Sequence, residues 1–157
     1  MRLKIMSLAA VLLLISFAGL ATAAETLGDD AKAELKKLQG TWELVSGEVD
    51  GKKVADEHAK QSKITWDGNK VSLVTPHQTK ETILGTITKM DLTKSPKEMH
   101  WVRSNGPSAG TTMIAIYEFE GGDQYKICFD PSGKISPKEF ATKEGTGHIR
   151  HTWKRVK

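Results

Sequence analysis

Hydrophobic and polar residues alternate along most of the chain after residue 40, a period of two that is typical of strands with one buried face. Turn-forming residues separate the alternating segments, and Asp67-Gly68-Asn69 in particular predicts a tight hairpin. The strands predicted in this way cover residues 41–49, 62–66, 70–75, 79–90, 98–103, 111–120, 124–130 and 148–156. About eight short strands without a long helix predict an all-β protein, built as an antiparallel sandwich or a closed barrel.

Three further segments interrupt or precede this pattern. Residues 31–38 predict a short helix, capped by Asp29 or Asp30, that must pack on the strands because eight residues are too few for a stable isolated helix. Residues 52–60 are interpreted as a loop or one helical turn. Residues 130–147 form a long connection that Phe140 would anchor, and it serves either to close the fold or as a recognition surface.

The first residues have the three parts of an export signal. Arg2 and Lys4 precede an uncharged run over 5–20, and Ala21-Thr22-Ala23 provides small residues for cleavage after Ala23 or Ala24. A retained membrane anchor is the alternative, but a span needs about 20 apolar residues and this run is shorter. We therefore expect a signal peptide over 1–23, a single domain over 24–157, a periplasmic or extracellular location, and no membrane anchor after cleavage.

Charge and cysteine content restrict the function further. The chain carries a net charge of +4, and loss of the two positive charges of Arg2 and Lys4 leaves +2 on the mature domain. No basic face is evident in the sequence, so nucleic acid is not an expected partner. The single cysteine, Cys128, lies in an apolar strand and is interpreted as a buried, inert thiol. It can form no intrachain disulfide and offers no lipid attachment at the cleavage site, so the hydrophobic core must stabilise the fold.

The first strand resembles the Gly-x-Trp signature of lipocalin-like barrels in its Gly40-Thr41-Trp42 segment, which follows directly on the short helix. The resemblance implies an up-and-down barrel in which Trp42 plugs the closed end and an arginine of the last strand lies across its ring. In that strand Trp153 and Arg155 share one face, and Arg150 takes the other. We therefore expect Gly40, Trp42, Trp153 and Arg155 to close the barrel, with Arg155 rather than Arg150 on the indole.

A closer resemblance covers nearly the whole mature chain. The chain is similar to an uncharacterised lipocalin-like domain family that is abundant in planctomycete bacteria and often exported, which implies an eight-stranded barrel and transfers no functional residue. The similar segments are Leu38-Gln39-Gly40-Thr41-Trp42-Glu43-Leu44, Asp50-Gly51-Lys52-Lys53, Ile127-Cys128-Phe129-Asp130-Pro131-Ser132-Gly133-Lys134 and Pro137-Lys138-Glu139-Phe140-Ala141-Thr142-Lys143-Glu144-Gly145-Thr146-Gly147.

No motif in the sequence assigns a catalytic residue, a metal ligand or a cofactor. A Gly-x-Ser-x-Gly nucleophile elbow is absent from the sequence. His148 and His151 are three apart on a strand, which sends them to opposite faces. His58, His77 and His100 lie in three separate predicted segments.

The inward pattern of the strands contains three aromatic residues suited to a pocket, Trp66, Trp101 and Tyr117. They would line a ligand site at the open end of the barrel, or form part of a core filled with side chains. The leading hypothesis is a non-enzymatic binding module for a small apolar or amphipathic ligand. The second is an interaction or scaffolding domain for another envelope protein, using residues 130–147 and exposed strand edges. The third is an envelope hydrolase that uses His100 with a nearby carboxylate.

Overall fold

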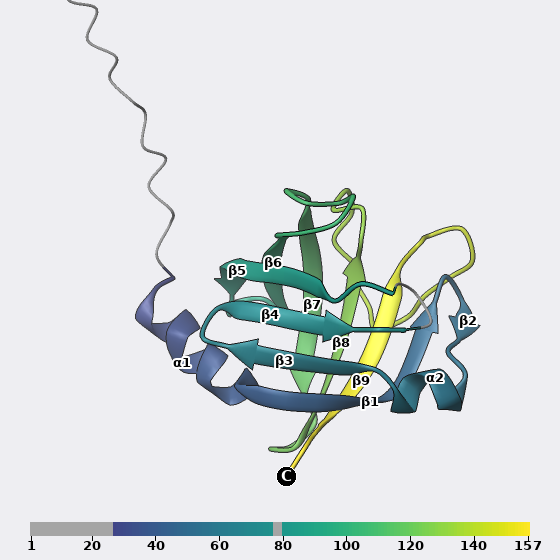
Figure 1. Ribbon diagram of the computed structural model, residues 1–157. Helices are drawn as coiled ribbons and strands as arrows, with labels where there is room; N and C mark the ends of the chain where they lie inside the picture. The colour runs from purple at the N-terminus through teal and green to yellow at the C-terminus, as the bar shows by residue number, and fades with distance from the viewer. Residues whose placement is uncertain (1–26, 77–79) are drawn as a thin grey trace, which may run out of the picture.

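A computed structural model describes residues 27–76 and 80–157 of the chain, as one antiparallel sheet with two short helices (Figure 1). The predicted signal peptide and its cleavage positions therefore lie outside the described residues, as does His77. The elements are α1 (Asp29–Leu38), β1 (Gly40–Val49), β2 (Lys52–Lys53), α2 (Asp56–Lys60), β3 (Lys63–Asp67), β4 (Lys70–Val74), β5 (Ile83–Asp91), β6 (Lys97–Arg103), β7 (Thr112–Phe119), β8 (Gln124–Asp130) and β9 (Ile149–Arg155).

Eight of the nine strands form a closed up-and-down barrel. Each pairs with its neighbours in chain order from β3 to β9, and β1 closes the ring by pairing with both β3 and β9. The remaining strand, β2, adds two residues to the end of β1 outside the ring. The all-β prediction is confirmed in its barrel form, and closure pairs each of the eight strands on both sides. Exposed strand edges, one of the two contact surfaces named in the interaction hypothesis, are thereby absent from the described barrel.

Helix α1 covers one end of the barrel, which we call the closed end. Its buried face consists of Ala31, Glu34, Leu35 and Leu38, at the spacing that a helix places on one side. The predicted side-chain cap is wrong: Gly28 is the N-cap residue, and Asp29 and Asp30 lie in the first turn. Their carboxylates still favour the helix there, because the N-terminal end of a helix dipole is positive.

Strand β5 begins at Ile83, later than the alternation over 79–90 predicts. The side chain of Asn105 accounts for the described part of this difference. Its Oδ1 accepts from the Leu84 amide at 2.8 Å, and its Nδ2 donates to the Thr82 carbonyl at 2.8 Å. These bonds satisfy backbone groups that strand pairing would otherwise satisfy, so the segment before Ile83 is held by a loop side chain. The alternation of residues in the sequence does not show that a loop side chain will replace strand pairing in this way.

The long connection after β8 contains no helix or strand over residues 131–148, all of which are described. The Asp130 carboxylate organises its start by accepting hydrogen bonds from the backbone amides of Ser132, Lys134 and Ile135. Further along, Thr142 hydrogen-bonds to the Glu48 carboxylate and to the Gly51 amide. The Lys126 ammonium lies 4.7 Å from the centre of the Phe140 ring. The connection is therefore fastened to the outside of the barrel at several points, as expected for a segment that completes the fold.

Candidate functional site

The closed end is built around Trp42, which is fully buried. Its indole Nε1–H donates to the Leu38 carbonyl at 2.7 Å, which ties the first strand to the end of α1. The guanidinium carbon of Arg155 lies 4.0 Å from the centre of the Trp42 ring, and Arg150 instead pairs with Glu48 on the outer face. Gly40 has a φ of +97°, a conformation that side-chain-bearing residues rarely adopt, and it lets the chain turn sharply from α1 into β1.

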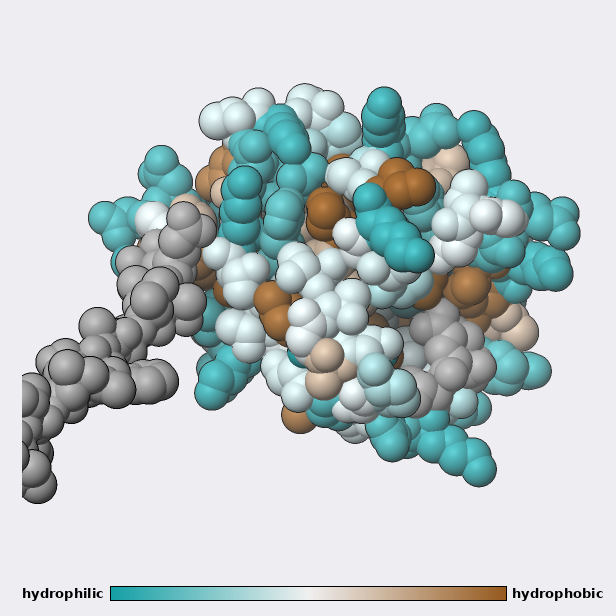
Figure 2. Space-filling view, turned by 90° about the horizontal axis from the view of Figure 1, so that it is seen from above, coloured by the Kyte–Doolittle hydropathy of each residue, from teal (hydrophilic) through white to brown (hydrophobic). Residues whose placement is uncertain are grey.

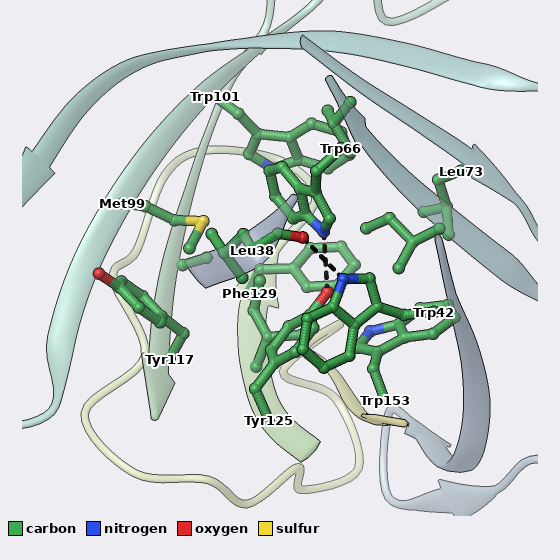
Figure 3. Close-up of a cluster of buried hydrophobic side chains, with 14 of the residues drawn as sticks. Leu38, Trp42, Trp66, Leu73, Met99, Trp101, Tyr117, Tyr125, Phe129 and Trp153 are labelled. Atoms are coloured by element: carbon green, nitrogen blue, oxygen red, sulfur yellow. Dashed lines mark hydrogen bonds between the residues drawn. The ribbon is translucent and has the colours of Figure 1, made fainter. Parts of the chain in front are cut away.

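The interior of the barrel is filled by aromatic side chains (Figure 3). Trp66 Nε1 donates to the Tyr125 hydroxyl at 3.1 Å, and the Tyr125 ring packs edge-on against Trp42 with centroids 4.7 Å apart. Trp153 is fully buried and packs edge-on against His151. The void left among these side chains measures about 10 Å³, roughly the space of a single water molecule. Of the two alternatives for the interior, an open ligand cavity and a core filled with side chains, the structure shows the filled core.

The three aromatic residues assigned to a ligand pocket do not meet in one place. Trp66 and Trp101 both line the small interior void. Tyr117 lies apart from them near the closed end, and in Figure 3 its hydroxyl points away from both indoles. That hydroxyl donates to the Glu34 carboxylate at 3.3 Å, and burial together with this negative charge raises the pKa of Tyr117. Tyr117 is thus part of the contact between α1 and the barrel.

A pocket of about 150 Å³ occupies the opposite end of the barrel, which we call the mouth. Eight residues line it, and Arg103 is the one polar residue among them. The seven apolar residues are Leu73, Ile83, Trp101, Met113, Phe129, Pro131 and Ile149. The Arg103 guanidinium is oriented by its own loop, because its Nε donates to the Asn105 carbonyl at 3.1 Å. An apolar cup with a single cation is suited to a small amphipathic molecule with an acceptor or an anionic group.

Trp101 forms the wall shared by the mouth pocket and the interior void. Its indole lies directly on the backbone of Gly85, where a Cβ atom would approach Cε3 to 2.5 Å. The residue is only 5% exposed, yet its Nε1–H has no acceptor among residues 27–76 and 80–157. The Nε1–H of Trp153 is in the same condition within the described chain. A buried donor without an acceptor lowers the stability of the fold by about 1–3 kcal/mol, and an acceptor on a bound ligand would recover this free energy.

Arg103 was not among the predicted site residues, although the sequence contains the signal for it. Met99 and Trp101 share the inward face of β6, and Arg103 is the next residue on that face. A positively charged residue at an inward position is expected at the end of a strand, where the barrel interior opens to solvent. Arg103 has this position at the end of β6. The sequence does not show which neighbouring strands bring Met113 and Ile149 to the same place, because that depends on barrel closure.

The carboxylate that the hydrolase hypothesis required is Glu98. Its Oε1 lies 2.9 Å from His100 Nε2, and its Oε2 accepts from the Ser136 hydroxyl at 2.9 Å and from the Lys94 ammonium at 2.8 Å. Burial opposes ionisation, but these three donors outweigh it and lower the pKa of Glu98 to about 2. A serine nucleophile needs the histidine itself as its base. Here Glu98 separates Ser136 from His100, so the cluster is an ion pair with two hydrogen bonds rather than a catalytic triad.

The remaining candidate chemistries are a metal site and a reactive cysteine. Within the two described segments, no group of three or more histidine, cysteine or acidic residues is placed to hold a metal ion. Cys128 is buried, its thiol faces the Ala141 carbonyl at 3.8 Å, and burial raises its pKa to about 11. A thiol with so high a pKa is a poor nucleophile at neutral pH.

Exposed hydrophobic residues are scattered over the part of the chain that the structure describes. On the face seen in Figure 2, hydrophobic residues form separate small patches among hydrophilic ones. The large hydrophobic side chains that are exposed, Val45, Val74, Leu84, Ile135 and Val156, come from different elements. In the part of the chain that the structure describes, none of the helices has the length and apolar character to cross a membrane. Compared with protein-family models, with curated proteins and with solved structures, the chain has no significant match.

Proposed function

We propose that this protein is an exported, non-enzymatic binding module that holds a small amphipathic anion at the mouth of its barrel. The observation that carries the proposal is the buried indole N–H of Trp101, which lacks an acceptor in the described structure and stands in the wall of an apolar pocket. A ligand with an acceptor group would supply the missing hydrogen bond. Arg103 would add a charge-assisted contact to the same group or to a second oxygen.

The dimensions of the pocket restrict the ligand. A cavity of about 150 Å³ accommodates a molecule the size of benzene, whereas sites for drug-sized ligands measure about 300–1,000 Å³. Because the interior below the mouth is filled, a long acyl chain cannot enter the barrel as it does in a hollow one. The ligand therefore has a short apolar part of about five or six carbons inside the pocket and its polar group at the Arg103 rim.

A comparison of three six-carbon probes tests the proposal. Hexanoate, hexanol and hexylammonium have similar apolar parts and differ in charge, and their binding is measured by calorimetry and by tryptophan fluorescence. We expect hexanoate to bind most tightly and hexylammonium least. Arg103→Gln should weaken hexanoate about tenfold and leave hexanol unchanged. The control variant Lys154→Gln changes an exposed cation of β9 and should have no effect.

The role of the indole N–H requires its own variant. Trp101→Phe keeps an aromatic ring and removes the donor, so it should weaken both hexanoate and hexanol about tenfold, the loss expected for one hydrogen bond at a buried site. Equal affinity for all three probes, or binding that neither variant changes, would overturn the proposal.

Export is the part of the proposal that rests on sequence alone. The uncharged run over 5–20 and the small residues Ala21 and Ala23 support it. The intact mass of protein recovered from outside the cytoplasm should correspond to a chain that starts at Ala24 or Glu25. A mass that includes Met1 would contradict the cleavage, and recovery of the protein from the cytoplasm alone would contradict the assigned compartment.

A further inference from the structure

A large hollow lies at the closed end, away from the mouth. It is a groove of about 730 Å³ between the end of α1, the turn from β5 to β6 and the turn from β7 to β8. Four cations line it, Lys37, Lys94, Lys97 and Arg155, whereas Glu118 is the one carboxylate among its described lining residues. We propose that this groove binds a short acidic peptide segment of a partner protein that carries a hydrophobic residue among its carboxylates.

The lysines of the groove are held in position by carboxylates that are themselves buried. Glu34 accepts from Lys37 at 2.7 Å and from Lys97 at 2.6 Å, and its side chain is only 4% exposed. The two lysine side chains remain 59% and 36% exposed. Each ammonium has three donors, and Glu34 takes one from each. The remaining donors are therefore available on the solvent side, on side chains whose positions are already ordered.

Lys94 follows the same division between a buried anion and an exposed cation, whereas the acidic lining residue, Glu118, is itself exposed. Lys94 is half-exposed and pairs with Glu98, whose side chain is 8% exposed. Glu118 is turned toward Lys126 of the neighbouring strand, with which it forms an ion pair at 3.1 Å. The nearest carboxylates of the three lysines, Glu34 and Glu98, thus lie beneath the surface, and the groove presents ammonium groups to solvent. Two carboxylates at its margin are more exposed and more distant: Asp91 lies 3.9 Å from Lys94, and Asp123 lies 3.8 Å from Arg155. Such a surface complements a chain of carboxylates.

The groove also has an apolar part, which is why we favour a peptide over an anionic polysaccharide. Pro96 and Phe119 line it, and the Phe119 ring packs edge-on against Tyr117 with centroids 6.1 Å apart. A hydrophobic side chain of the peptide would rest on Phe119 while flanking carboxylates reach the lysines. At Gly121 and Gly122 the wall consists of backbone alone, and a Cβ atom at either position would meet no other atom within 4 Å.

Gly122 allows a test that leaves every lysine and its buried partner in place. Its φ lies outside the left-handed region, so a side chain is tolerated there. Gly122→Asp adds a negative charge to the groove, Gly122→Asn is the matched neutral control, and Gly122→Lys adds a positive charge. Thermal unfolding of the three variants verifies that the fold is retained.

The probe is the fluorescein-labelled peptide Glu-Glu-Phe-Glu-Glu, compared with Gln-Gln-Phe-Gln-Gln and with Glu-Glu-Ser-Glu-Glu by fluorescence anisotropy. We expect the Glu-Phe peptide to bind at least tenfold more tightly than either comparison, and less tightly as salt rises from 50 to 300 mM. Gly122→Asp should weaken it about tenfold, Gly122→Asn less than twofold, and Gly122→Lys should strengthen it. Arg103→Gln, at the mouth, should have no effect, so this result is independent of the ligand proposed there.

Three results would overturn the inference. The first is equal binding of the Glu and Gln peptides. The second is an equal effect of Gly122→Asp and Gly122→Asn, which would place the binding elsewhere. The third is tighter binding of an oligogalacturonate, an anionic sugar chain, than of the Glu-Phe peptide, with the same response to Gly122→Asp, which would identify a polysaccharide as the occupant.

Discussion

The guanidinium carbon of Arg155 lies 4.0 Å from the centre of the Trp42 ring, and the guanidinium also donates to two carbonyl oxygens at the end of α1. One side chain of the last strand therefore joins the first strand and the N-terminal helix. The carbonyl groups at the end of a helix lack partners within the helix, so these two hydrogen bonds satisfy acceptors that α1 leaves open. The contact therefore joins the first and last strands of the chain at the closed end of the barrel.

Replacement of Trp42 is expected to be the most destabilising single change at the closed end. Trp42→Ala removes a fully buried indole, its hydrogen bond to Leu38 and its edge contact with Tyr125. The expected loss is about 3–5 kcal/mol in the free energy of unfolding, measured by urea denaturation. Trp42→Phe, which keeps an aromatic ring, should cost clearly less. A loss below about 1 kcal/mol for Trp42→Ala would show that the residue is not the plug of the barrel.

Arg155→Lys tests the guanidinium apart from its charge. Lysine keeps the positive charge but has no planar fork to stack on Trp42 while bonding the Lys37 and Gln39 carbonyls. We expect a loss of about 1–2 kcal/mol in unfolding free energy. Lys154→Arg, at the exposed neighbouring position, is the control and should change stability by less than about 0.5 kcal/mol. An equal effect of the two substitutions would mean that the stacked geometry contributes nothing.

Sequence patterns predicted the barrel well because its strands bury one face each. The alternation of Met99 and Trp101 with Glu98 and His100 places the first two inside, as the structure has them. Alternation does not distinguish a filled interior from a hollow one, because both need inward apolar residues. The outcome depends on side-chain volumes across the barrel, such as the contact of Trp66 with Tyr125, which are 59 residues apart.

Glu34 illustrates a second limit of the sequence. It stands in the polar-looking part of a short helix, and nothing in its neighbourhood indicates a buried carboxylate. Its burial depends on Lys97 and Tyr117, from strands more than 60 residues away. Although burial opposes ionisation, the two lysines hold the pKa of Glu34 below its usual value. Polar contacts between distant elements of this kind are specified by the fold and carry no local signal.

Docking of the long connection after β8 can be tested by two glycine substitutions. Gly133 and Gly145 both have a positive φ, at 70° and 83°. A Cβ atom at Gly133 would overlap the Thr112 carbonyl oxygen of β7, whereas one at Gly145 would meet no atom within 4 Å. Both alanine variants incur the backbone cost, of about 1 kcal/mol, but only Gly133→Ala must also displace the connection from β7. We expect Gly133→Ala to be less stable than Gly145→Ala by at least 1–2 kcal/mol, and equal losses would show that the connection is not docked there.

The buried carboxylate of Glu98 should make the stability of the protein depend on pH in the acid range. Its pKa is lowered from 4.5 to about 2 by Lys94, His100 and Ser136, which outweigh the cost of burial. A group whose pKa is lower in the folded state stabilises the protein above its unfolded pKa, and this contribution is lost as pH falls from about 4.5 toward 2. Because Lys94 is half-exposed, solvent screening reduces the contribution to about 2 kcal/mol.

Glu98→Gln should therefore lower the unfolding free energy near pH 7, and the difference from the parent should shrink toward pH 2. Glu118→Gln, which removes an exposed carboxylate, controls for the change in net charge. A difference between parent and Glu98→Gln that stays constant from pH 7 to pH 2 would contradict the assigned ionisation.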